Sequence, residues 1–231
     1  LAKRGKMPIR QRIMNVLDDD SPFLEISPLA AYGTDYTVGG GCVSGIGLIA
    51  GVECVIFGND PSVKAGAMTV YAGEKWRRAI EISRDNKIPF ISFVESAGGD
   101  LSMGTGSKSG QDPISPTLQQ DHFAATGRLF YEMTELSKLK IPVISVVFGS
   151  STAGGAYQPG MSDYNIFMKD QSQVFLAGPP IVMAATGEVS DAETLGGAQM
   201  HSEISGLSDY LAEDEMDALR ICREVVSHLN W

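Results

Sequence analysis

Two apolar runs that each end in a pair of glycines constrain this chain more than any other feature of its sequence. The run at 141–147 leads into Phe-Gly-Ser-Ser-Thr-Ala-Gly-Gly-Ala-Tyr at 148–157, and the run at 89–94 leads into Glu-Ser-Ala-Gly-Gly at 95–99. Short apolar runs of this kind predict buried strands. Glycine accepts positive φ and lets a ligand approach the main chain closely. Two such turns predict a site that is built from backbone groups.

The second turn adds to this prediction, because its small residues at 153–156 stand where a short helix can begin. The first N–H groups of a helix have no acceptor within the helix and carry the positive end of its dipole. Such amides form a fixed positive site for a carbonyl oxygen that gains negative charge during a reaction.

Helical patterns alternate with the apolar runs along the chain. We predict an amphipathic helix at 8–17, a hairpin at 42–59 that turns at Ala50-Gly51, strands at 90–95, 142–148, 164–168 and 174–176, and helices at 68–85, 121–138 (with Asp121 as N-cap) and 213–228. This order predicts one α/β domain whose central strands are covered by helices on both faces.

The polar segment at 100–120 interrupts this alternation. It is rich in Gly, Ser and Pro and has almost no apolar residues. A compact domain rarely carries a segment of this length without secondary structure. It is either a mobile flap beside the turn at 98–99 or a disordered surface loop, and both interpretations stay open.

Composition excludes several classes of function. The net charge of −10 and the pI near 4.7 argue against nucleic acid as a partner. No apolar run reaches membrane-spanning length, and we find no signal peptide. The three cysteines, Cys42, Cys54 and Cys222, lack the spacing of a disulfide framework or a zinc ribbon and fit a reducing compartment. Two of the three lie in apolar, strand-like surroundings, where a packed thiol is expected.

Basic residues nevertheless gather in two places. The first twelve residues contain Lys3, Arg4, Lys6, Arg10 and Arg12, and a second group comprises Lys75, Arg77 and Arg78. Each group is either the solvated face of a helix or a site for an anionic ligand.

Reactive side chains near the turns do not form a recognisable set. The candidate nucleophiles are Ser150, Ser151 and Thr152, with His122 or His201 as base, but the G-x-S-x-G elbow is missing. The candidate general bases are Glu95, Asp100 and Glu188. P-loop and dinucleotide fingerprints are absent, and the histidines lack metal-ligand spacing. Oxyanion donors without an acid–base set suit a reaction in which a ligand or cofactor brings the base and the protein stabilises an enolate.

At this point the residues also resemble a known family. The run at 149–163, Gly-Ser-Ser-Thr-Ala-Gly-Gly-Ala-Tyr-Gln-Pro-Gly-Met-Ser-Asp, is similar to the core motif of the carboxyltransferase (β) subunits of biotin-dependent acyl-CoA carboxylases, such as the propionyl-CoA and methylcrotonyl-CoA enzymes. Further blocks follow in the same order at 175–180, 185–188, 195–198, 201 and 205–206, and the opening at 4–12 also matches. The resemblance covers essentially all 231 residues.

The resemblance implies a crotonase-like (ClpP/crotonase) fold of stacked ββα units. It implies that residues 1–231 form the N-terminal, acyl-CoA-binding domain of a longer two-domain subunit. In such enzymes a carboxyl group moves from carboxybiotin, held on a carrier domain, to an acyl-CoA through a thioester enolate. The base then arrives with the cofactor, which accounts for the missing catalytic histidine.

The resemblance places the thioester oxyanion hole on the backbone N–H groups of Gly154 and Gly155. It implies these further substrate-binding residues: Ala97, Gly98, Gly99, Ala153, Ala156 and Tyr157 at the turns, and Lys64, Arg77 and Arg78 for the CoA phosphates. It implies no metal. Valine at Gly154 or Gly155 is expected to abolish carboxyl transfer with little loss of folding.

The turn at 96–101 departs from the family, since it reads Ser-Ala-Gly-Gly-Asp-Leu where many members have Ser-Gly-Gly-Ala-Arg. The missing zinc ribbon favours the propionyl/methylcrotonyl branch.

The implied partners are an acyl-CoA, a biotin carboxylase/biotin carrier subunit and further copies of the subunit (a hexamer in the family). The implied compartment is the bacterial cytoplasm, which is favoured, or the mitochondrial matrix. Two alternatives are kept: the carboxyltransferase of a biotin-dependent decarboxylase, and a non-catalytic acyl-CoA-binding module.

Overall fold

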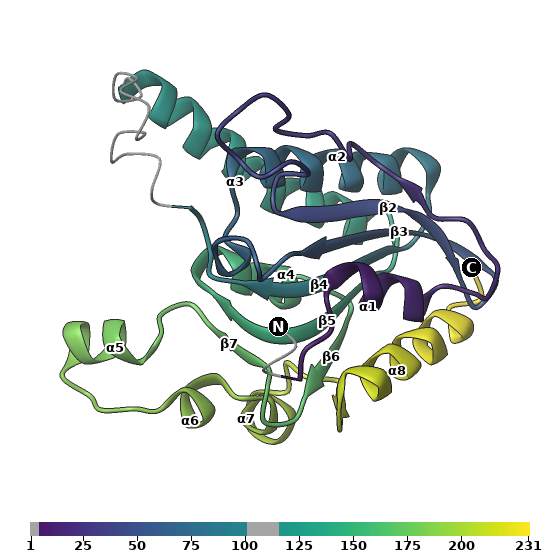
Figure 1. Ribbon diagram of the computed structural model, residues 1–231. Coiled ribbons are helices and arrows are strands. Elements are labelled where there is room, and N and C mark those ends of the chain that lie inside the picture. Colours follow the sequence, from purple (N-terminus) through teal and green to yellow (C-terminus); the bar gives the residue numbers. More distant parts are fainter. Residues whose placement is uncertain (1–4, 101–115) are drawn as a thin grey trace.

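The structure, a computed structural model, describes residues 5–100 and 116–231, and it describes residues 116–126 by their backbone alone. Most of the polar segment predicted as a flap or loop therefore lies outside the described residues. The described parts fold around one mixed sheet of eight strands (Figure 1).

The sheet runs in the order β1-β2-β3-β4-β5-β6-β8, and β7 pairs with β5 beyond the end of β6. The first three strands pair antiparallel, and the pairs from β3 onward are parallel. The strands are β1 (Leu24–Glu25), β2 (Cys42–Ile49), β3 (Val52–Asn59), β4 (Phe90–Ser96), β5 (Val143–Thr152), β6 (Tyr164–Met168), β7 (Gln173–Phe175) and β8 (Tyr210–Ala212).

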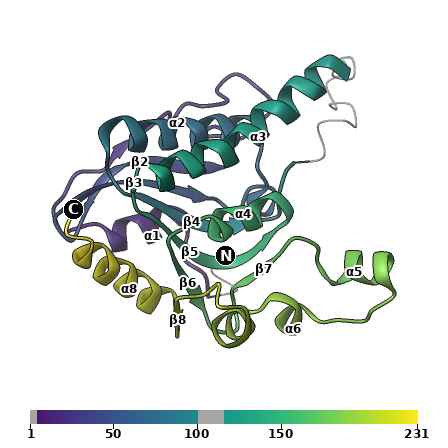
Figure 2. The same cartoon turned by 180° about the vertical axis from the view of Figure 1, so that it is seen from behind.

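Helices cover both faces of the sheet, as predicted. Figures 1 and 2 show α2 and α3 on one side and α1 and α8 on the other, and each pair packs on its own apolar core. The helices are α1 (Ile9–Val16), α2 (Val70–Asn86), α3 (Pro116–Lys138), α4 (Tyr157–Gly160), α5 (Pro179–Thr186), α6 (Ala192–Gly196), α7 (Ala198–Met200) and α8 (Glu215–His228), with 3₁₀-helices η2 (Lys64–Gly66) and η4 (Ala153–Ala156) and a π-helix η5 (His201–Ser205).

Local signals in the sequence account for several of these boundaries. The hairpin of β2 and β3 turns at Ala50 and Gly51, whose φ angles of 50° and 80° are those of a type I′ turn. The side chain of Thr69 accepts a hydrogen bond from the Ala72 amide and so caps α2. Asp214 caps α8 in the same way through the Asp217 amide.

Two predicted boundaries are wrong. Helix α3 begins at Pro116, so Asp121 lies inside the helix and is not its N-cap. Proline is favoured in the first turn of a helix, where its missing N–H has no role. Strand β5 continues to Thr152 instead of ending near 148, because β7 pairs with residues 150–152.

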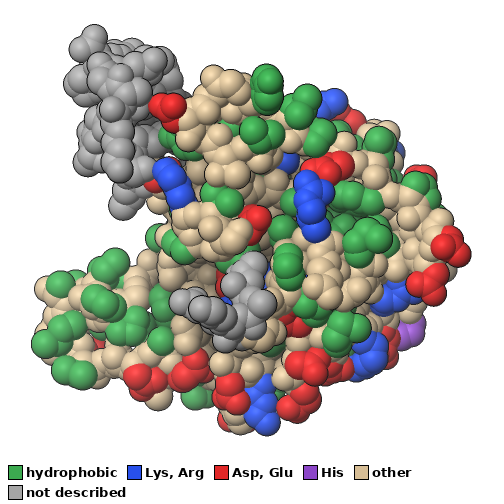
Figure 3. Space-filling model, viewed as in Figure 1, with side chains coloured by type: hydrophobic (Ala, Val, Ile, Leu, Met, Phe, Trp, Pro, Cys, Tyr) green, Lys and Arg blue, Asp and Glu red, His purple; other side chains and the backbone are tan. Residues whose placement is uncertain are grey.

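Residues 176–191, called the arm below, extend away from the sheet (Figure 1). Helix α5 within the arm has no buried residue. Figure 3 shows apolar side chains gathered on this extension, and the large exposed ones are Leu176, Ile181, Met183 and Val189. Among the helices that the structure describes, none combines the length and the apolar character needed to cross a lipid bilayer.

Candidate functional site

The pairing of β4 with β5 brings the two glycine-rich turns together. The strands are parallel neighbours, in register from Phe90 opposite Val143 to Val94 opposite Val147. Their carboxyl ends therefore lie at the same edge of the sheet, where ligands of α/β folds usually bind. A methyl group built on Gly98 would lie 3.0 Å from the Thr152 carbonyl oxygen. The two turns are thus in direct contact.

A third segment holds the first turn in place. The Ala97 amide donates to the Ala65 carbonyl at 3.1 Å, and the Met68 amide donates to the Gly98 carbonyl at 2.7 Å. The Asp100 amide returns a bond to the Met68 carbonyl at 3.0 Å. The first turn is therefore fixed by backbone hydrogen bonds on both of its sides.

The second turn is the start of a helix. After β5 the chain enters η4 with Ala153 at φ 51°, and η4 leads directly into α4. A 3₁₀-helix joins each N–H to the carbonyl three residues earlier. The amides of Ala153 and Gly154 thus have no acceptor within η4, whereas Gly155 is the first residue that can reach one, on Thr152. Gly154 is exposed and Gly155 is buried, so the Gly154 amide is the more accessible donor.

Open space surrounds one glycine in each turn. A methyl group on Gly99 or on Gly154 would meet nothing within 4 Å, and neither residue has positive φ. Nothing in the described chain requires a glycine at these two exposed positions. The absence of side chains there leaves room for a ligand against the backbone.

Gly155, unlike Gly154, is crowded by neighbouring side chains. A methyl group on Gly155 would lie 3.0 Å from Ser151 Oγ and 3.1 Å from Ser96 Cβ and Oγ. Valine at Gly155 would therefore overpack a buried site, contrary to the expectation that folding would be spared. The expectation fits Gly154, where the space is free.

The other predicted turn residues differ in what they can offer a ligand. Ala97 and Ala153 are exposed, whereas Ala156 is buried in a small core with Val94 and Val147. Tyr157 is 42% exposed, and its ring packs in a tilted orientation against Phe130 of α3, with 4.6 Å between the ring centroids. Ala156 can therefore serve a ligand only through its backbone.

Lys64 stands close to the first turn. Its Nζ lies 2.5 Å from Asp100 Oδ2, directly after the Gly98-Gly99 pair, and 5.2 Å from the centre of the Tyr36 ring. Asp100 is thus an ion-pair partner, and its carboxylate is 7% exposed.

The second basic group is divided by its helix. Lys75 is buried, and its Nζ donates to the carbonyls of Gly39 (3.0 Å) and Cys42 (2.9 Å). Burial lowers the pKa of Lys75. The interpretation of Lys75 as a solvated or anion-binding residue is therefore wrong.

The two arginines of that group lie at the surface of α2. Hydrogen bonding to Glu74 raises the pKa of Arg77, which also pairs with Glu81 at 2.6 Å. Arg78 is exposed. The carboxylates of α2 therefore hold the guanidinium of Arg77, whereas the guanidinium of Arg78 is more accessible.

The first basic group also differs from both interpretations. Lys3 and Arg4 lie outside the described residues. Lys6 and Arg12 are largely buried and pair with Glu95, so that this carboxylate is held by two cations. Arg10 forms two bonds of 2.8 Å to Glu25. Glu95 is a structural ion-pair partner in this arrangement.

The candidate nucleophiles and bases do not assemble. Both ring nitrogens of His201 are engaged, Nε2 with the Val174 carbonyl at 2.8 Å and Nδ1 with Ser205 Oγ at 2.7 Å. Ser150 Oγ donates to Gln173 Oε1 at 3.0 Å. Glu188 is exposed on the arm, and the side chain of His122 lies outside the described residues. No serine-based triad forms among the residues whose side chains the structure describes.

Metal and thiol chemistry are also unsupported. Within the described residues no group of three or more His, Cys, Asp or Glu side chains could hold a metal ion. All three cysteines are buried, so the packing predicted for two of them is confirmed and holds for the third as well. Burial raises the pKa of Cys42 to about 11 and that of Cys222 to about 12. These thiols are core residues.

Known proteins similar to this chain point in one direction. A family model described as the carboxyl transferase domain matches residues 2–231. A probable biotin-dependent acyl-coenzyme A carboxylase beta2 subunit of Mycobacterium tuberculosis is 51% identical over 228 residues, which are 99% of this chain and 40% of that protein. The mitochondrial methylcrotonoyl-CoA carboxylase beta chain of Dictyostelium discoideum is 44% identical over 98% of this chain and 37% of its own length.

Solved structures agree. The beta subunit of P. aeruginosa geranyl-CoA carboxylase is similar with a TM-score of 0.86 and 38% identity, over 100% of this chain and 40% of that one. Transcarboxylase 12S, solved with methylmalonyl-coenzyme A bound, is similar with a TM-score of 0.83 and 27% identity, over 98% of this chain and 42% of that one. These likenesses confirm the crotonase-like α/β fold. The chain spans about 40% of the length of the relatives it matches.

Proposed function

We infer, from the premise that this chain belongs to the carboxyl transferase domain family, that its two glycine-rich turns bind the thioester of an acyl-CoA and stabilise its enolate. The observation that carries the proposal is the exposed Gly154 amide, which lacks an acceptor within η4 and has free space around its Cα. Relatives named as biotin-dependent acyl-CoA carboxylase beta subunits support the choice of substrate class.

In the proposed reaction, this chain has only to bind the thioester and polarise it. The Gly154 amide donates to the thioester oxygen as negative charge develops there, and the Gly155 amide follows it in the same turn. The dipole of the short helical start adds to the stabilisation. The first turn forms the opposite wall through Ala97, Gly98 and Gly99. Ala153, Tyr157 and the backbone of Ala156 complete the proposed lining.

The cofactor fits this set of residues. Among the described side chains near the turns, Glu95, Asp100 and His201 are engaged in ion pairs or hydrogen bonds, so none of these three is poised as a general base. Carboxybiotin, when bound, would supply the carboxyl group and, once CO₂ has left it, the base. We propose that a partner carrier domain would bring it to the turns, where the chain's own role is to hold the thioester.

We also propose that basic side chains near the turns bind the phosphates of CoA. Lys64 is the candidate beside the first turn, although Asp100 already pairs with it. Arg78 is exposed, and none of the ion pairs among the described residues involves it, whereas Arg77 is held by Glu74 and Glu81. We therefore rank Arg78 before Arg77 as a phosphate ligand.

The organisation of the whole protein is likewise proposed. We propose that these residues form the acyl-CoA half of a subunit whose other half, or a neighbouring copy, receives the biotin. A biotin carboxylase/biotin carrier subunit and a homo-oligomer, a hexamer by analogy with transcarboxylase 12S, would complete the enzyme. The relatives include bacterial and mitochondrial proteins, and we favour a bacterial cytoplasmic enzyme.

The test is Gly154→Val in the full-length protein. Blocking access to an oxyanion donor should lower kcat for acyl-CoA carboxylation by about 100-fold or more. The melting temperature should change little, because the Cβ of the valine would meet no atom within 4 Å. Gly160→Val is the matched control, since Gly160 also has nothing within 4 Å and lies at the far end of α4. Undiminished carboxylation by Gly154→Val would count decisively against the proposal.

The two alternatives share this geometry. A decarboxylase would use the same turns in the opposite direction, and a binding module would use them without turnover. Measuring carboxylation of propionyl-CoA and decarboxylation of methylmalonyl-CoA with the same full-length protein and its carrier separates the three cases.

A further inference from the structure

The ladder between β4 and β5 is interrupted directly before the second turn. After Val94 pairs with Val147, the next pair is Ser96 with Ser151. Glu95 alone on β4 therefore faces three residues of β5, residues 148–150. Such bulges re-aim the end of a strand and are common beside active sites. Here the bulge sets where β5 delivers residues 151–155.

Side chains take the place of a strand partner inside the bulge. No register pair of the sheet includes Phe148 or Gly149. The Phe148 carbonyl instead accepts hydrogen bonds from Lys6 Nζ at 3.1 Å and from Gln171 Nε2 at 2.9 Å. Two side chains distant in sequence thus converge on one backbone oxygen of the bulge.

A buried charge network holds these two donors. Lys6 Nζ lies 2.5 Å from Glu95 Oε1, and Gln171 Nε2 donates to Glu215 Oε1 at 3.3 Å. Arg12 joins the carboxylates, with Nη1 at 3.2 Å from Glu95 Oε2 and Nη2 at 2.8 Å from Glu215 Oε1. Its side chain is 1% exposed, and those of the two glutamates are 12% and 7% exposed. We call these five residues the bulge network.

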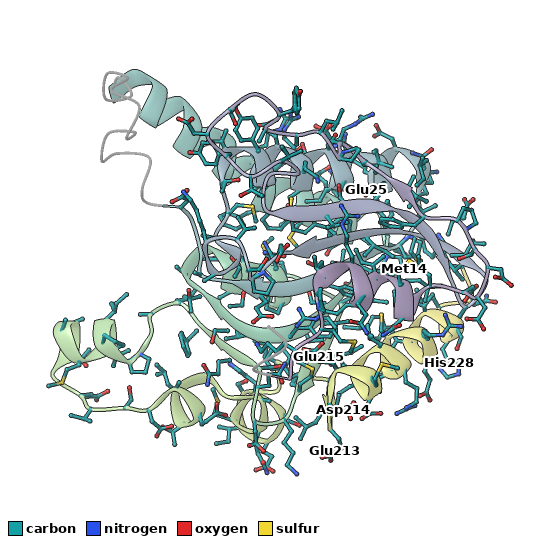
Figure 4. All side chains as sticks on the ribbon, in the orientation of Figure 1. Met14, Glu25, Glu213, Asp214, Glu215 and His228 are labelled. Carbon is teal, nitrogen blue, oxygen red and sulfur yellow. The ribbon has the colours of Figure 1, made fainter. Side chains whose placement is uncertain are left out.

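The bulge network and the bulge interlock. A methyl group on Gly149 would lie 2.6 Å from Glu95 Oε1 and 2.7 Å from Lys6 Nζ. The Arg12 guanidinium lies 4.2 Å from the centre of the Phe148 ring. Figure 4 shows Glu215 where α1 and α8 meet the sheet, so the network draws on several separate elements. Two cations and two anions balance its charge.

Stability alone does not account for this arrangement. Buried ion pairs lose in desolvation about what they gain in attraction, so they are weak evidence for a stabilising role. A network with fixed geometry does, however, fix the position of the groups that it bonds. The group it bonds here is the Phe148 carbonyl, upstream of the Gly154-Gly155 turn.

We propose that Lys6 and Gln171 are positioning residues for the second turn. By fixing the Phe148 carbonyl they set the bulge, and the bulge sets the distance between the Gly154 amide and the first turn. The kinetic consequence of this inference rests on the proposed function, whereas its geometric consequence does not.

The experiment uses Gln171→Leu and Lys6→Met in the full-length protein. Each removes one donor to Phe148 and leaves the Arg12–Glu215 pair in place. We expect kcat for carboxylation to fall by about tenfold while KM for the acyl-CoA changes by less than about twofold, since misplaced donors affect the transition state more than binding. Crystal structures of the variants should show the Gly154 nitrogen displaced relative to Ser96. Lys6→Arg, which keeps the positive charge and a hydrogen-bond donor, should have a kcat close to that of the wild-type protein.

Arg10→Gln is the matched control. Arg10 belongs to the same helix as Arg12 and forms two bonds of 2.8 Å to Glu25, but it does not touch the bulge. Its loss should change neither kcat nor the turn. If Lys6→Met fails to fold, Gln171→Leu carries the test, because it leaves every ion pair of the network intact.

The outcomes separate this inference from the proposed function. An undisplaced turn in both variants overturns the inference, whether or not kcat falls. A displaced turn with reduced kcat supports both ideas. A displaced turn with wild-type kcat supports the positioning role and overturns the assignment of the turn as the oxyanion site.

Discussion

The two glycine-rich turns lie side by side at one edge of the sheet, yet their glycines meet different needs. Gly98 has φ 87° and would press a methyl group to 3.0 Å from the Thr152 carbonyl oxygen. Gly155 is buried against Ser151 and Ser96. Gly99 and Gly154 have ordinary φ and free space. Each turn thus contains one glycine that packing requires and one that nothing in the described chain requires.

This difference teaches how to recognise a backbone site. A glycine with positive φ or a close neighbour is explained by the fold itself. A glycine that is exposed, unstrained and uncrowded is explained better by something that approaches from outside. The first turn is also tied on both sides to residues 65–68, whereas the second opens into a helical start. In the proposed function the first turn is therefore the wall of the site, and the second turn provides the hydrogen-bond donors.

The largest effect on stability is expected for Gly98→Ala. A side chain at φ 87° is strained, and its contact with the Thr152 carbonyl adds overpacking. The free energy of unfolding should fall by about 3 kcal/mol. Gly51→Ala is the control, because Gly51 has φ 80° but nothing within 4 Å, and should cost only about 1 kcal/mol. If urea titrations gave the same loss of unfolding free energy for both variants, the contact with the Thr152 carbonyl would add nothing to the cost.

A smaller loss is expected for Gly155→Ala. Its φ is ordinary, but the methyl group would lie 3.0 Å from Ser151 Oγ and needs a small adjustment. The cost should be about 1–2 kcal/mol. Adding Ser151→Ala removes the nearest atom and should recover part of the loss, as a double-mutant cycle would measure. Strict additivity would show that the crowding lies elsewhere.

Ser151→Ala alone should change stability by about 1 kcal/mol at most, in the stabilising direction. The Ser151 hydroxyl is buried and has no hydrogen-bond partner in the described residues. Removing an unpartnered buried polar atom relieves a desolvation cost. A marked destabilisation in thermal melts would show that the hydroxyl has a partner in the protein in solution.

The smallest effect on stability is expected for Gly99→Ala. The methyl group meets free space at ordinary φ, so the free energy of unfolding should change by no more than about 0.5 kcal/mol. Its effect should instead be seen in the KM for the acyl-CoA, because the methyl group narrows the space between the turns. A Gly99→Ala protein as unstable as Gly98→Ala would end the distinction between the two glycines.

The parts of the fold that sequence predicted well are those encoded locally. The hairpin at 42–59 and the strands that lead into the turns are short apolar runs with clear ends, and their positions were correct within a few residues. The extension of β5 to Thr152 was missed because the residues of β7 that pair with it lie 23 residues further along the chain. The family resemblance supplied the crotonase-like arrangement.

The basic groups show where sequence reading failed and where it had a usable signal. Lys75 lies three residues after Ala72 and four before Ala79, both buried, so helical spacing already placed it on the covered face of α2. The partners of Arg12 gave no such signal. Glu95 and Glu215 are 83 and 203 residues away, and only the fold brings them together.

The burial of every cysteine has a practical consequence for spectroscopy. Within these 231 residues Cys42, Cys54 and Cys222 are all shielded, so maleimide dyes should leave the folded domain unmodified. Val189→Cys, at a position that is 88% exposed on the arm, would then offer a single attachment point for a fluorophore. Energy transfer from that dye to an acceptor on a second polypeptide would measure how near the arm lies to it.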